Sequence, residues 1–412
     1  MFTILQLILF IALSVMAFLT GYLFLLTIAA TKAQKTTTLS SVQPIHRFLI
    51  LIPAYNEERL LPSTLENLFQ LDYPSTLFDV HVVADNCTDQ TVIVGRAGGA
   101  IVHERHNLTQ KGKGYALTWL LEQLWATNQS DNIPEAFVIL DADTVVSKNF
   151  LRVMDVRLSN GEQVIQAYYA VRDPSRSWAT SIRYIALAAL HFLRPLGRMV
   201  LGGSVGLKGN GMVFAAGIMK NHQWSAHLTE DIEFHMQLIL AGERVTFAPD
   251  AVVEAEMPDT LRGAQTQNAR WERGRVEMAR HYIPALWKGS IKAFRANQPR
   301  QAYLLLDAIM EHLIPPFSIF VAASAFFCLS ALLLPTGNIS PLKTINLVIG
   351  IGIILAQIIY TFTSLVLVQA PGKVYKALLY APIFVLWKIG VYLKVFSKND
   401  QHEWVRTARN EP

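Results

Sequence analysis

Three long stretches of the chain carry no charged side chain. They cover residues 4–30, 313–334 and 344–370. As a helix, each is long enough to cross about 30 Å of hydrocarbon, and buried helices of soluble proteins rarely lack a polar face over such a length. We therefore predict a transmembrane anchor over 1–31 and two spans within a membrane region over 300–396. A secretory signal would have a basic start and a shorter apolar core, so we expect the anchor to be uncleaved.

A fourth apolar stretch, residues 374–396, differs because it contains Lys376, Lys388 and Lys394. A lysine near the bilayer centre costs about 3 kcal/mol, so we predict an amphipathic helix that lies in the membrane interface. With three spans, the central domain and a tail over 397–412 fall on the same, positively charged side, and 335–343 falls on the other. We predict a multi-pass protein of the inner or plasma membrane with a cytoplasmic central domain.

Between the anchor and the second span, short apolar runs alternate with helical patterns. Runs at 48–52, 80–84, 100–103 and 137–140 predict strands, and apolar positions at helical spacing near 60–69, after 88 and over 115–125 predict helices. This alternation is typical of an α/β fold with a mostly parallel sheet and helices on both faces. We place this domain at 45–285.

The rest of that domain is less regular. Residues 163–170 predict a strand, and 178–201 predict a helix that lies either on the membrane surface or in the core. Two further helices are expected, one from 230 until Gly242 and one over 260–281.

Composition narrows the class of protein. Hydrophobic residues make up 52% of the chain and charged residues 16%, which is unusual for a soluble protein. The net charge of +5 comes without a basic stripe interleaved with aromatics, so we expect no nucleic-acid partner and assign the charge to contact with membrane lipids. Cys87 and Cys328, the two cysteines, lie far apart in the sequence and predict no disulfide framework.

Acidic residues follow the ends of two predicted strands. Asp85 follows one, and Asp141 and Asp143 follow another. Ligands bind at the carboxyl ends of parallel strands, and Mg²⁺ commonly takes one or two carboxylates together with substrate phosphates. The Asp-x-Asp pair therefore predicts a metal site for a nucleotide diphosphate, although a solvated turn is the alternative.

Glu230 and Asp231 open a predicted helix. Acidic residues in a first turn stabilise the helix dipole, which by itself is one explanation for them. The other is general-base catalysis, in which one carboxylate deprotonates an acceptor hydroxyl. We assign that base to Asp231, with Glu230 beside it.

Gln267, Arg270 and Trp271 fall on one face of the helix predicted over 260–281. An arginine fork suits phosphate oxygens, and a tryptophan ring suits the floor of a sugar pocket. Other arginines of this helix are expected to face solvent or headgroups: Arg262, Arg273 and Arg275.

Weaker candidates lie elsewhere. Lys113 opens a helix after Gly112 without the P-loop order, so phosphate binding there is open. Gly209 and Gly211 lack the third glycine of a dinucleotide fingerprint, and we expect them to relieve backbone crowding. The histidines have no zinc-type spacing, and His227 is expected to be structural.

Together these motifs resemble the membrane-integrated family-2 glycosyltransferases, which include cellulose, hyaluronan and poly-N-acetylglucosamine synthases and some lipid glucosyltransferases. The resemblance covers nearly the whole chain. The segments that carry it are Ile52-Pro-Ala-Tyr-Asn-Glu57, Asp85, Asp141-Ala-Asp143, Thr229-Glu-Asp231 and Gln267-x-x-Arg-Trp271.

The resemblance implies a GT-A fold, a UDP-sugar donor, Mg²⁺ or Mn²⁺, and transfer with inversion at the anomeric carbon. By motif, Asp143 would hold the metal, and Asp231 with Glu230 would form the catalytic pair. Gln267, Arg270 and Trp271 would hold the pyrophosphate and the acceptor. The residues implied for the nucleotide are Tyr55, Glu57 and Asp85, with Asp141 near the ribose. We add Pro53 and Lys113 as further candidates for binding the nucleotide sugar.

The chain departs from cellulose synthases because it lacks their Phe-x-Val-Thr-x-Lys gating loop and has fewer predicted spans. A polymer channel within one polypeptide is therefore doubtful, and an accessory subunit or a homo-oligomer stays open. We expect a hexosyltransferase that moves glucose or N-acetylglucosamine to a glycan or polysaccharide at the cytoplasmic face. The alternative is transfer of a single sugar to a membrane lipid.

Overall fold

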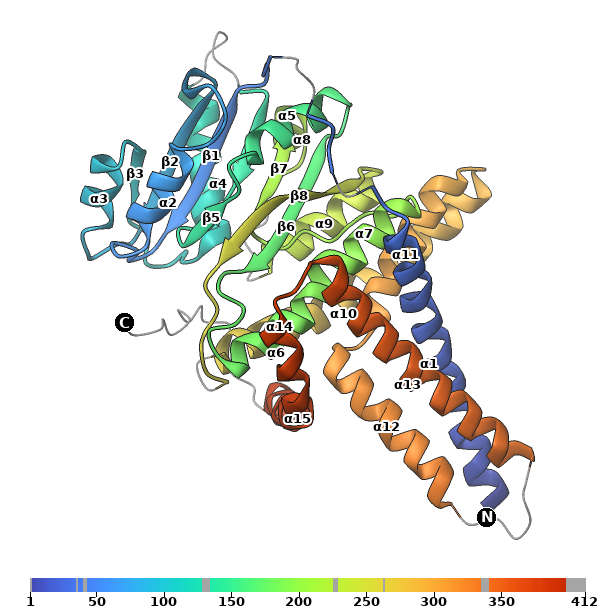
Figure 1. Ribbon diagram of the computed structural model, residues 1–412. Coiled ribbons are helices and arrows are strands. Elements are labelled where there is room, and N and C mark those ends of the chain that lie inside the picture. The colour runs from blue at the N-terminus through green and yellow to red at the C-terminus, as the bar shows by residue number, and fades with distance from the viewer. Residues whose placement is uncertain are drawn as a thin grey trace.

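The computed structural model describes residues 2–34, 36–39, 43–127, 134–224, 229–261, 264–334 and 341–397. An α/β domain built on one eight-stranded sheet occupies one end of the molecule, and long helices project from the other (Figure 1). The strand order is β3-β2-β1-β4-β7-β6-β8-β5.

The first half of the sheet is parallel and matches the predicted strands. It consists of β1 (Phe48–Ala54), β2 (Phe78–Asp85), β3 (Ile101–Arg105) and β4 (Ala136–Ile139). Successive residues of β1 enter opposite cores, since Leu49 and Leu51 pack on one face and Ile50 and Ile52 on the other. Burial on both faces explains the uninterrupted apolar runs. The connecting helices are α2 (Leu61–Leu68), η1 (Ser75–Leu77), α3 (Thr91–Ala97) and α4 (Lys113–Thr127).

The second half of the sheet is mixed. It consists of β5 (Thr144–Val146), β6 (Val164–Val171), β7 (Met212–Ala215) and β8 (Val245–Ala255). β6 and β8 are parallel, β7 runs antiparallel to both of its neighbours, and β5 runs antiparallel to β8. The prediction of a mostly parallel α/β sheet is confirmed. β5 and β7 have three and four residues, too few for a recognisable alternation.

The predicted helix over 178–201 forms with one irregular turn. It is divided into α6 (Trp178–Ala188), a π-helical turn η2 (Ala189–Leu193) and α7 (Arg194–Val200). Most of its residues are buried, including the guanidinium-bearing Arg183, Arg194 and Arg198, so it is a core helix. The other helices of this half are α5 (Phe150–Ser159), α8 (Ala216–Asn221) and α9 (Glu230–Ala241). As expected, α9 ends at Gly242, whose φ is +93°.

Three apolar helices run side by side away from the sheet: α1 (Phe2–Thr31), α12 (Phe317–Leu333) and α13 (Pro341–Leu367) (Figure 1). Among the described residues, the segments long and apolar enough to cross a membrane alone are Ile4–Thr31, Pro341–Leu367 and Gly372–Leu393. The predicted span over 313–334 is shorter than expected. α12 begins only after Pro315 and Pro316, where the chain bends by 69° from α11 (Pro299–Leu313).

The last described segment consists of α14 (Gly372–Lys376), η3 (Ala377–Tyr380) and α15 (Ala381–Ser397). In Figure 1, α15 runs along the line of sight, whereas α1, α12 and α13 run across the picture. This direction suits the predicted interfacial helix, although the segment also has the length of a span. The expected external loop at 335–340 and the tail after 397 lie outside the described residues.

The helix predicted over 260–281 is longer than its pattern indicated. α10 spans Gln265–Arg295 and contains Pro284 within it. It packs against α9, α11 and α15, so it joins the sheet domain to the membrane helices.

The anchor packs tightly on the sheet domain at one glycine. A side chain at Gly197 of α7 would overlap the backbone of Leu26 in α1. We predict that Gly197→Ala lowers the unfolding temperature in detergent by several degrees, because overpacking costs about 1–3 kcal/mol. The matched control is Gly21→Ala in α1, where nothing lies within 4 Å of the added methyl group. Equal unfolding temperatures of Gly197→Ala and wild type would contradict this packing.

Candidate functional site

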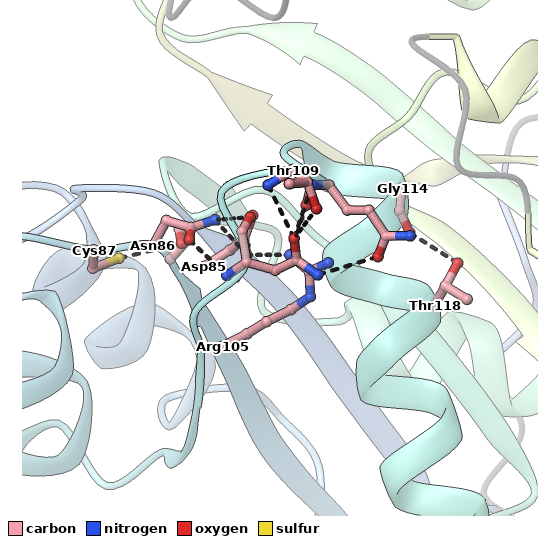
Figure 2. Close-up of polar contacts among 10 residues, drawn as sticks. Asp85, Asn86, Cys87, Arg105, Thr109, Gly114 and Thr118 are labelled. Atoms are coloured by element: carbon pink, nitrogen blue, oxygen red, sulfur yellow. Dashed lines mark hydrogen bonds and ion pairs between the residues drawn. The ribbon is translucent and has the colours of Figure 1, made fainter.

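Asp85 is held by a buried arginine that the sequence did not point to. Arg105, at the end of the neighbouring strand β3, donates to Asp85 Oδ1 at 2.6 Å, and both side chains are buried (Figure 2). Asn86 Nδ2 donates to the same oxygen at 3.0 Å. No hydrogen bond from a described residue reaches Asp85 Oδ2, and Asp85 lines a large cavity. One oxygen is thus fixed by the protein while the other remains available to a ligand.

The loops after β1 and β2 brace each other. Asn56 and Asn86 both adopt φ of 55°, the left-handed region, which asparagine tolerates better than most residues. The Asn56 N–H donates to Cys87 Sγ at 3.4 Å, and the Cys87 thiol donates to the Ala54 carbonyl at 3.4 Å. Tyr55, next to Asn56 in this loop, is 37% exposed.

The two acidic residues after β4 lie beside a lysine. Lys113 Nζ donates to Asp141 Oδ1 at 2.5 Å and also to the Gly209 carbonyl. Burial alone would lower the pKa of Lys113, but the carboxylates of Asp141 and Glu230 outweigh it and raise that pKa. Lys113 is therefore a charged group at the centre of the acidic cluster.

The turn at 209–211 fits closely against this cluster. Gly211 has φ of +67°, and a Cβ there would lie 2.6 Å from Val253 Cγ2, so the expectation that these glycines relieve crowding is confirmed. Between them, the buried Asn210 accepts from the Asp141 N–H at 3.2 Å and donates to Thr144 Oγ1 at 2.9 Å. The sequence signal for these contacts of Asn210 is its position between two glycines.

Glu230 and Asp231 lie at the start of α9 and face the same cavity. Burial and the neighbouring charge of Asp231 raise the pKa of Glu230 to about 8, and burial raises the pKa of Asp231. Two adjacent carboxylates in such a place cannot both ionise easily, so the pair holds on to a proton more strongly than free carboxylates do.

Helix α10 is fixed against the start of α9 by another glycine. A side chain at Gly274 would overlap Thr229, the residue before Glu230. This contact places Gln267, Arg270 and Trp271 on the wall of the cavity that contains Asp231. Their spacing predicts that these three residues share one helix face, but it does not predict that this face lines the cavity that contains Asp231.

Gln267 has a buried partner that sequence reasoning missed. Arg183 of α6 donates to Gln267 Oε1 at 2.7 Å, and burial lowers the pKa of Arg183 to about 10. Arg183 Nη1 is buried and has no hydrogen-bond partner among the described residues. A buried cation that itself lines the cavity therefore holds Gln267 in the wall.

One expectation for the arginines of α10 was wrong, and a lysine from α15 contacts the same helix. Arg275 does not face solvent or headgroups, since it donates to the Ile314 carbonyl at 2.7 Å and to the Tyr392 hydroxyl at 3.0 Å. Lys388 is buried and contacts Asn268 Oδ1 at 2.6 Å and Glu272 Oε1 at 3.0 Å. The periodicity of α10 could not predict these contacts, because the two partners in each contact lie far apart in the sequence. Arg273 lines the cavity, whereas Arg262 and His227 lie outside the described residues.

One cavity of about 2310 Å³ connects these groups. Its polar half contains every residue predicted for the site: Pro53, Tyr55, Glu57, Asp85, Lys113, Asp141, Asp143, Glu230, Asp231, Gln267, Arg270 and Trp271. Its other half continues between the membrane helices and is lined mainly by apolar side chains: Phe317, Val321, Ala325, Ile354, Ile358, Phe362, Phe384 and Val385.

The acidic residues fit a metal that binds together with its substrate. The described part of the chain has no group of three or more His, Cys, Asp or Glu that could hold a metal. Asp141 and Asp143 nevertheless line the same cavity, and burial and then their charges raise the pKa of the nearby Tyr169 hydroxyl. Two carboxylates together with substrate phosphates are a common ligand set for Mg²⁺.

The family follows from comparison with known proteins. Residues 46–274, more than half of the chain, match the family model described as glycosyltransferase like family 2, and the chain belongs to this family. Its fold is GT-A: a mannosyltransferase from Pyrobaculum calidifontis, solved with GDP-mannose and Mn²⁺, superposes with a TM-score of 0.51 over 93% of this chain and 99% of that one, at 17% identity. The predicted family and fold are thus confirmed.

Curated relatives are more distant than the family match suggests. The chain is 26% identical over 278 residues to a β-monoglucosyldiacylglycerol synthase of Synechocystis sp., which covers 62% of this chain and 54% of that one. It is 23% identical over 252 residues to a poly-β-1,6-N-acetyl-D-glucosamine synthase of Staphylococcus epidermidis, covering 58% and 57%. A probable glycosyltransferase of Bacillus subtilis, YdaM, is 23% identical over 265 residues, covering 60% of each chain. The matched regions span between about half and three fifths of these relatives.

The raised pKa of Glu230 predicts a specific dependence of stability on pH. Its folded value of about 8 exceeds the ordinary 4.5, so the folded protein keeps a proton that the unfolded chain releases. The stability of the metal-free protein should therefore fall between about pH 4.5 and pH 8. Glu230→Gln should remove this loss of stability. Measured with a chelator present, the variant should unfold a few degrees above wild type, and the gain should be larger at pH 8 than at pH 5.

The control for this experiment is Glu122→Gln, which replaces an exposed glutamate of α4. It should change the unfolding temperature equally at both pH values. A gain for Glu230→Gln that is the same at pH 5 and pH 8 would mean that Glu230 is ionised throughout this range.

Proposed function

We propose that the protein is a metal-dependent, inverting hexosyltransferase that moves one sugar from a UDP-sugar to the hydroxyl group of a membrane lipid. The observation that carries this proposal is the single cavity, whose polar half contains the acidic cluster and whose apolar half lies between α12, α13 and α15. A lipid acceptor needs both halves, because its headgroup must reach the sugar while its acyl chains stay in an apolar environment.

The donor nucleotide is expected at the carboxyl ends of β1 and β2. Asp85 Oδ2 is available to accept a hydrogen bond from an N–H group of the base, which uracil has, and the exposed ring of Tyr55 can stack on it. Pro53 and Glu57 belong to the same wall of the cavity. Asp141, placed two residues beyond β4, is expected near the ribose.

Asp143 and the donor diphosphate would hold the Mg²⁺ or Mn²⁺ ion, with Asp141 beside it. The ion would neutralise the charge that develops on the leaving diphosphate. Lys113 lies close to Asp141 and supplies a second positive charge for the phosphates. Arg270 adds a guanidinium from α10, and Gln267 and Trp271 complete the wall toward the acceptor.

The transfer itself needs a base on the acceptor side. The ionised Asp231 takes the proton from the acceptor hydroxyl as its oxygen attacks the anomeric carbon. The bond from that carbon to the diphosphate oxygen breaks, and its electron pair leaves with UDP. The protonated Glu230 limits the negative charge beside Asp231. A single displacement of this kind inverts the anomeric configuration.

A glycan or polysaccharide acceptor, the first expectation from the sequence, would use the same polar half. The ring of Trp271 favours it, since aromatic rings pack well against sugars. The apolar lining between the membrane helices favours the lipid instead. We keep the cytoplasmic orientation of the sheet domain as part of the proposal, because the positively charged segments next to the spans support it.

The proposed metal ligand Asp143 and the proposed base Asp231 should affect different quantities: the first UDP affinity, the second turnover. Asp143→Ala should reduce Mn²⁺-dependent UDP affinity at least tenfold, because a metal ligand is lost, whereas Asp231→Asn should keep UDP affinity within about twofold and lower turnover at least a hundredfold. Calorimetric titration of UDP with and without Mn²⁺ and measurement of UDP release check both variants. Wild-type UDP affinity in Asp143→Ala, or retained transfer in Asp231→Asn, would refute the respective role.

The product identifies the acceptor. Purified protein in lipid nanodiscs, given radiolabelled UDP-glucose or UDP-N-acetylglucosamine, should place the label in an organic extract as a lipid that carries one sugar. Asp231→Asn in the same nanodiscs is the matched control and should give no labelled lipid. Label in a water-soluble or precipitating polymer would instead establish the glycan acceptor.

A further inference from the structure

A buried cation at the membrane end of the cavity has no acidic partner among the described residues. Arg194, the first residue of α7, is only 8% exposed. Its Nε donates to the Tyr360 hydroxyl at 2.7 Å, and its guanidinium carbon lies 5.8 Å from the centre of the Tyr360 ring. Neither terminal nitrogen of Arg194 donates to any described residue, and Arg194 lines the cavity. A guanidinium in such a place is costly unless an anion joins it.

The nearby acidic residues are already engaged. Arg198, one turn further along α7, pairs with Asp307 at 2.6 Å and with Glu311, both on α11. Lys208 Nζ lies 3.7 Å from Glu311 Oε1 and therefore shares that carboxylate with Arg198. Among the described residues, these two carboxylates therefore pair with Arg198 and Lys208, and neither forms an ion pair with Arg194.

Lys208 connects this charge to the proposed base. Burial lowers the pKa of Lys208, and the charges of Arg198 and Arg194 lower it further, while those of Glu311 and Asp231 oppose the change. Arg194, Lys208 and Asp231 all line the same cavity, which agrees with these electrostatic interactions. An anion held by these two cations would sit next to the position where the acceptor hydroxyl must lose its proton.

The surroundings limit what this anion can be. The cavity wall beside Arg194 continues into the apolar residues Phe317 and Val321 of α12 and Ile358 of α13. A free inorganic anion would not use this apolar surface, but a phosphate joined to acyl chains would. The arrangement places two cations where a lipid headgroup would meet its tails.

We propose that Arg194 and Lys208 bind the phosphate of an anionic phospholipid acceptor whose headgroup hydroxyl receives the sugar. The site rests on the proposed lipid acceptor and adds the chemical class of that lipid. It makes a phosphodiester such as phosphatidylglycerol a better acceptor than diacylglycerol with the same acyl chains, because only the former supplies the missing negative charge.

The test compares two acceptors in detergent micelles. Catalytic efficiency, kcat/KM, is measured for phosphatidylglycerol and for diacylglycerol with identical acyl chains, in wild type, Arg194→Gln, Arg194→Lys and Lys208→Gln. The control is Arg300→Gln, which removes the same charge from an exposed position at the start of α11. Mn²⁺-dependent UDP affinity verifies that each variant is folded.

Wild type and Arg300→Gln should prefer phosphatidylglycerol at least tenfold. Arg194→Gln should abolish this preference through a raised KM, Lys208→Gln should reduce it, and Arg194→Lys should retain part of it. Inorganic phosphate at tens of millimolar should inhibit wild type only weakly, because it lacks acyl chains. Equal kcat/KM for both lipids in wild type would overturn the proposal. An equal loss of kcat/KM on both lipids in Arg194→Gln would also overturn it, because that is the result expected if Arg194 only makes a structural contact with Tyr360.

A binding measurement separates this site from the proposed function. If neither lipid is glycosylated, native mass spectrometry of protein incubated with phosphatidylglycerol still tests the site. Retention by wild type and by Arg300→Gln but not by Arg194→Gln would support the phosphate site while the proposed transfer fails. Equal retention by all three proteins would overturn the site. If wild type glycosylates diacylglycerol as efficiently as phosphatidylglycerol, the proposed function is retained and the phosphate site is rejected.

Discussion

The contact between Gly274 of α10 and Thr229 brings α10 against the start of α9, on which the arrangement of the proposed site depends. Because no side chain intervenes there, the start of α9, with Asp231, lies against the helix that carries Trp271. The same α10 helix is held from the membrane side by Lys388 of α15. The sheet domain and the membrane helices therefore share one cavity, and residues of α10 line it between the proposed donor and acceptor regions.

Charge is distributed unevenly along this cavity. At the end proposed for the nucleotide, Arg105 neutralises Asp85, so that part is balanced before any ligand binds. In the middle, carboxylates outnumber the cation Lys113, which suits a metal ion and a retained proton on Glu230. At the membrane end, Arg194 leaves positive charge in excess. A divalent metal ion would offset the excess of carboxylates in the middle, and an anionic acceptor would offset the positive charge at the membrane end.

Much of the fold and of the site could be predicted from sequence because both depend on local patterns. Strands buried on both faces, such as β1, leave uninterrupted apolar runs, and residues after strand ends, such as Asp143, converge at one edge of the sheet. The supporting residues could not be predicted in the same way. Arg183 and Lys388 reach their partners from helices that are 84 and 120 residues away in sequence, so no spacing or periodicity connects them.

The central claim is that one cavity receives a nucleotide sugar at the sheet and a lipid between the membrane helices. A cryo-electron microscopy structure in nanodiscs, with Mn²⁺ and a non-hydrolysable UDP-sugar, tests it most directly. The account predicts the nucleotide between Tyr55 and Asp143, and a lipid whose acyl chains lie between α12, α13 and α15. A glycan in that space, or side chains that close it when the donor binds, would contradict the account.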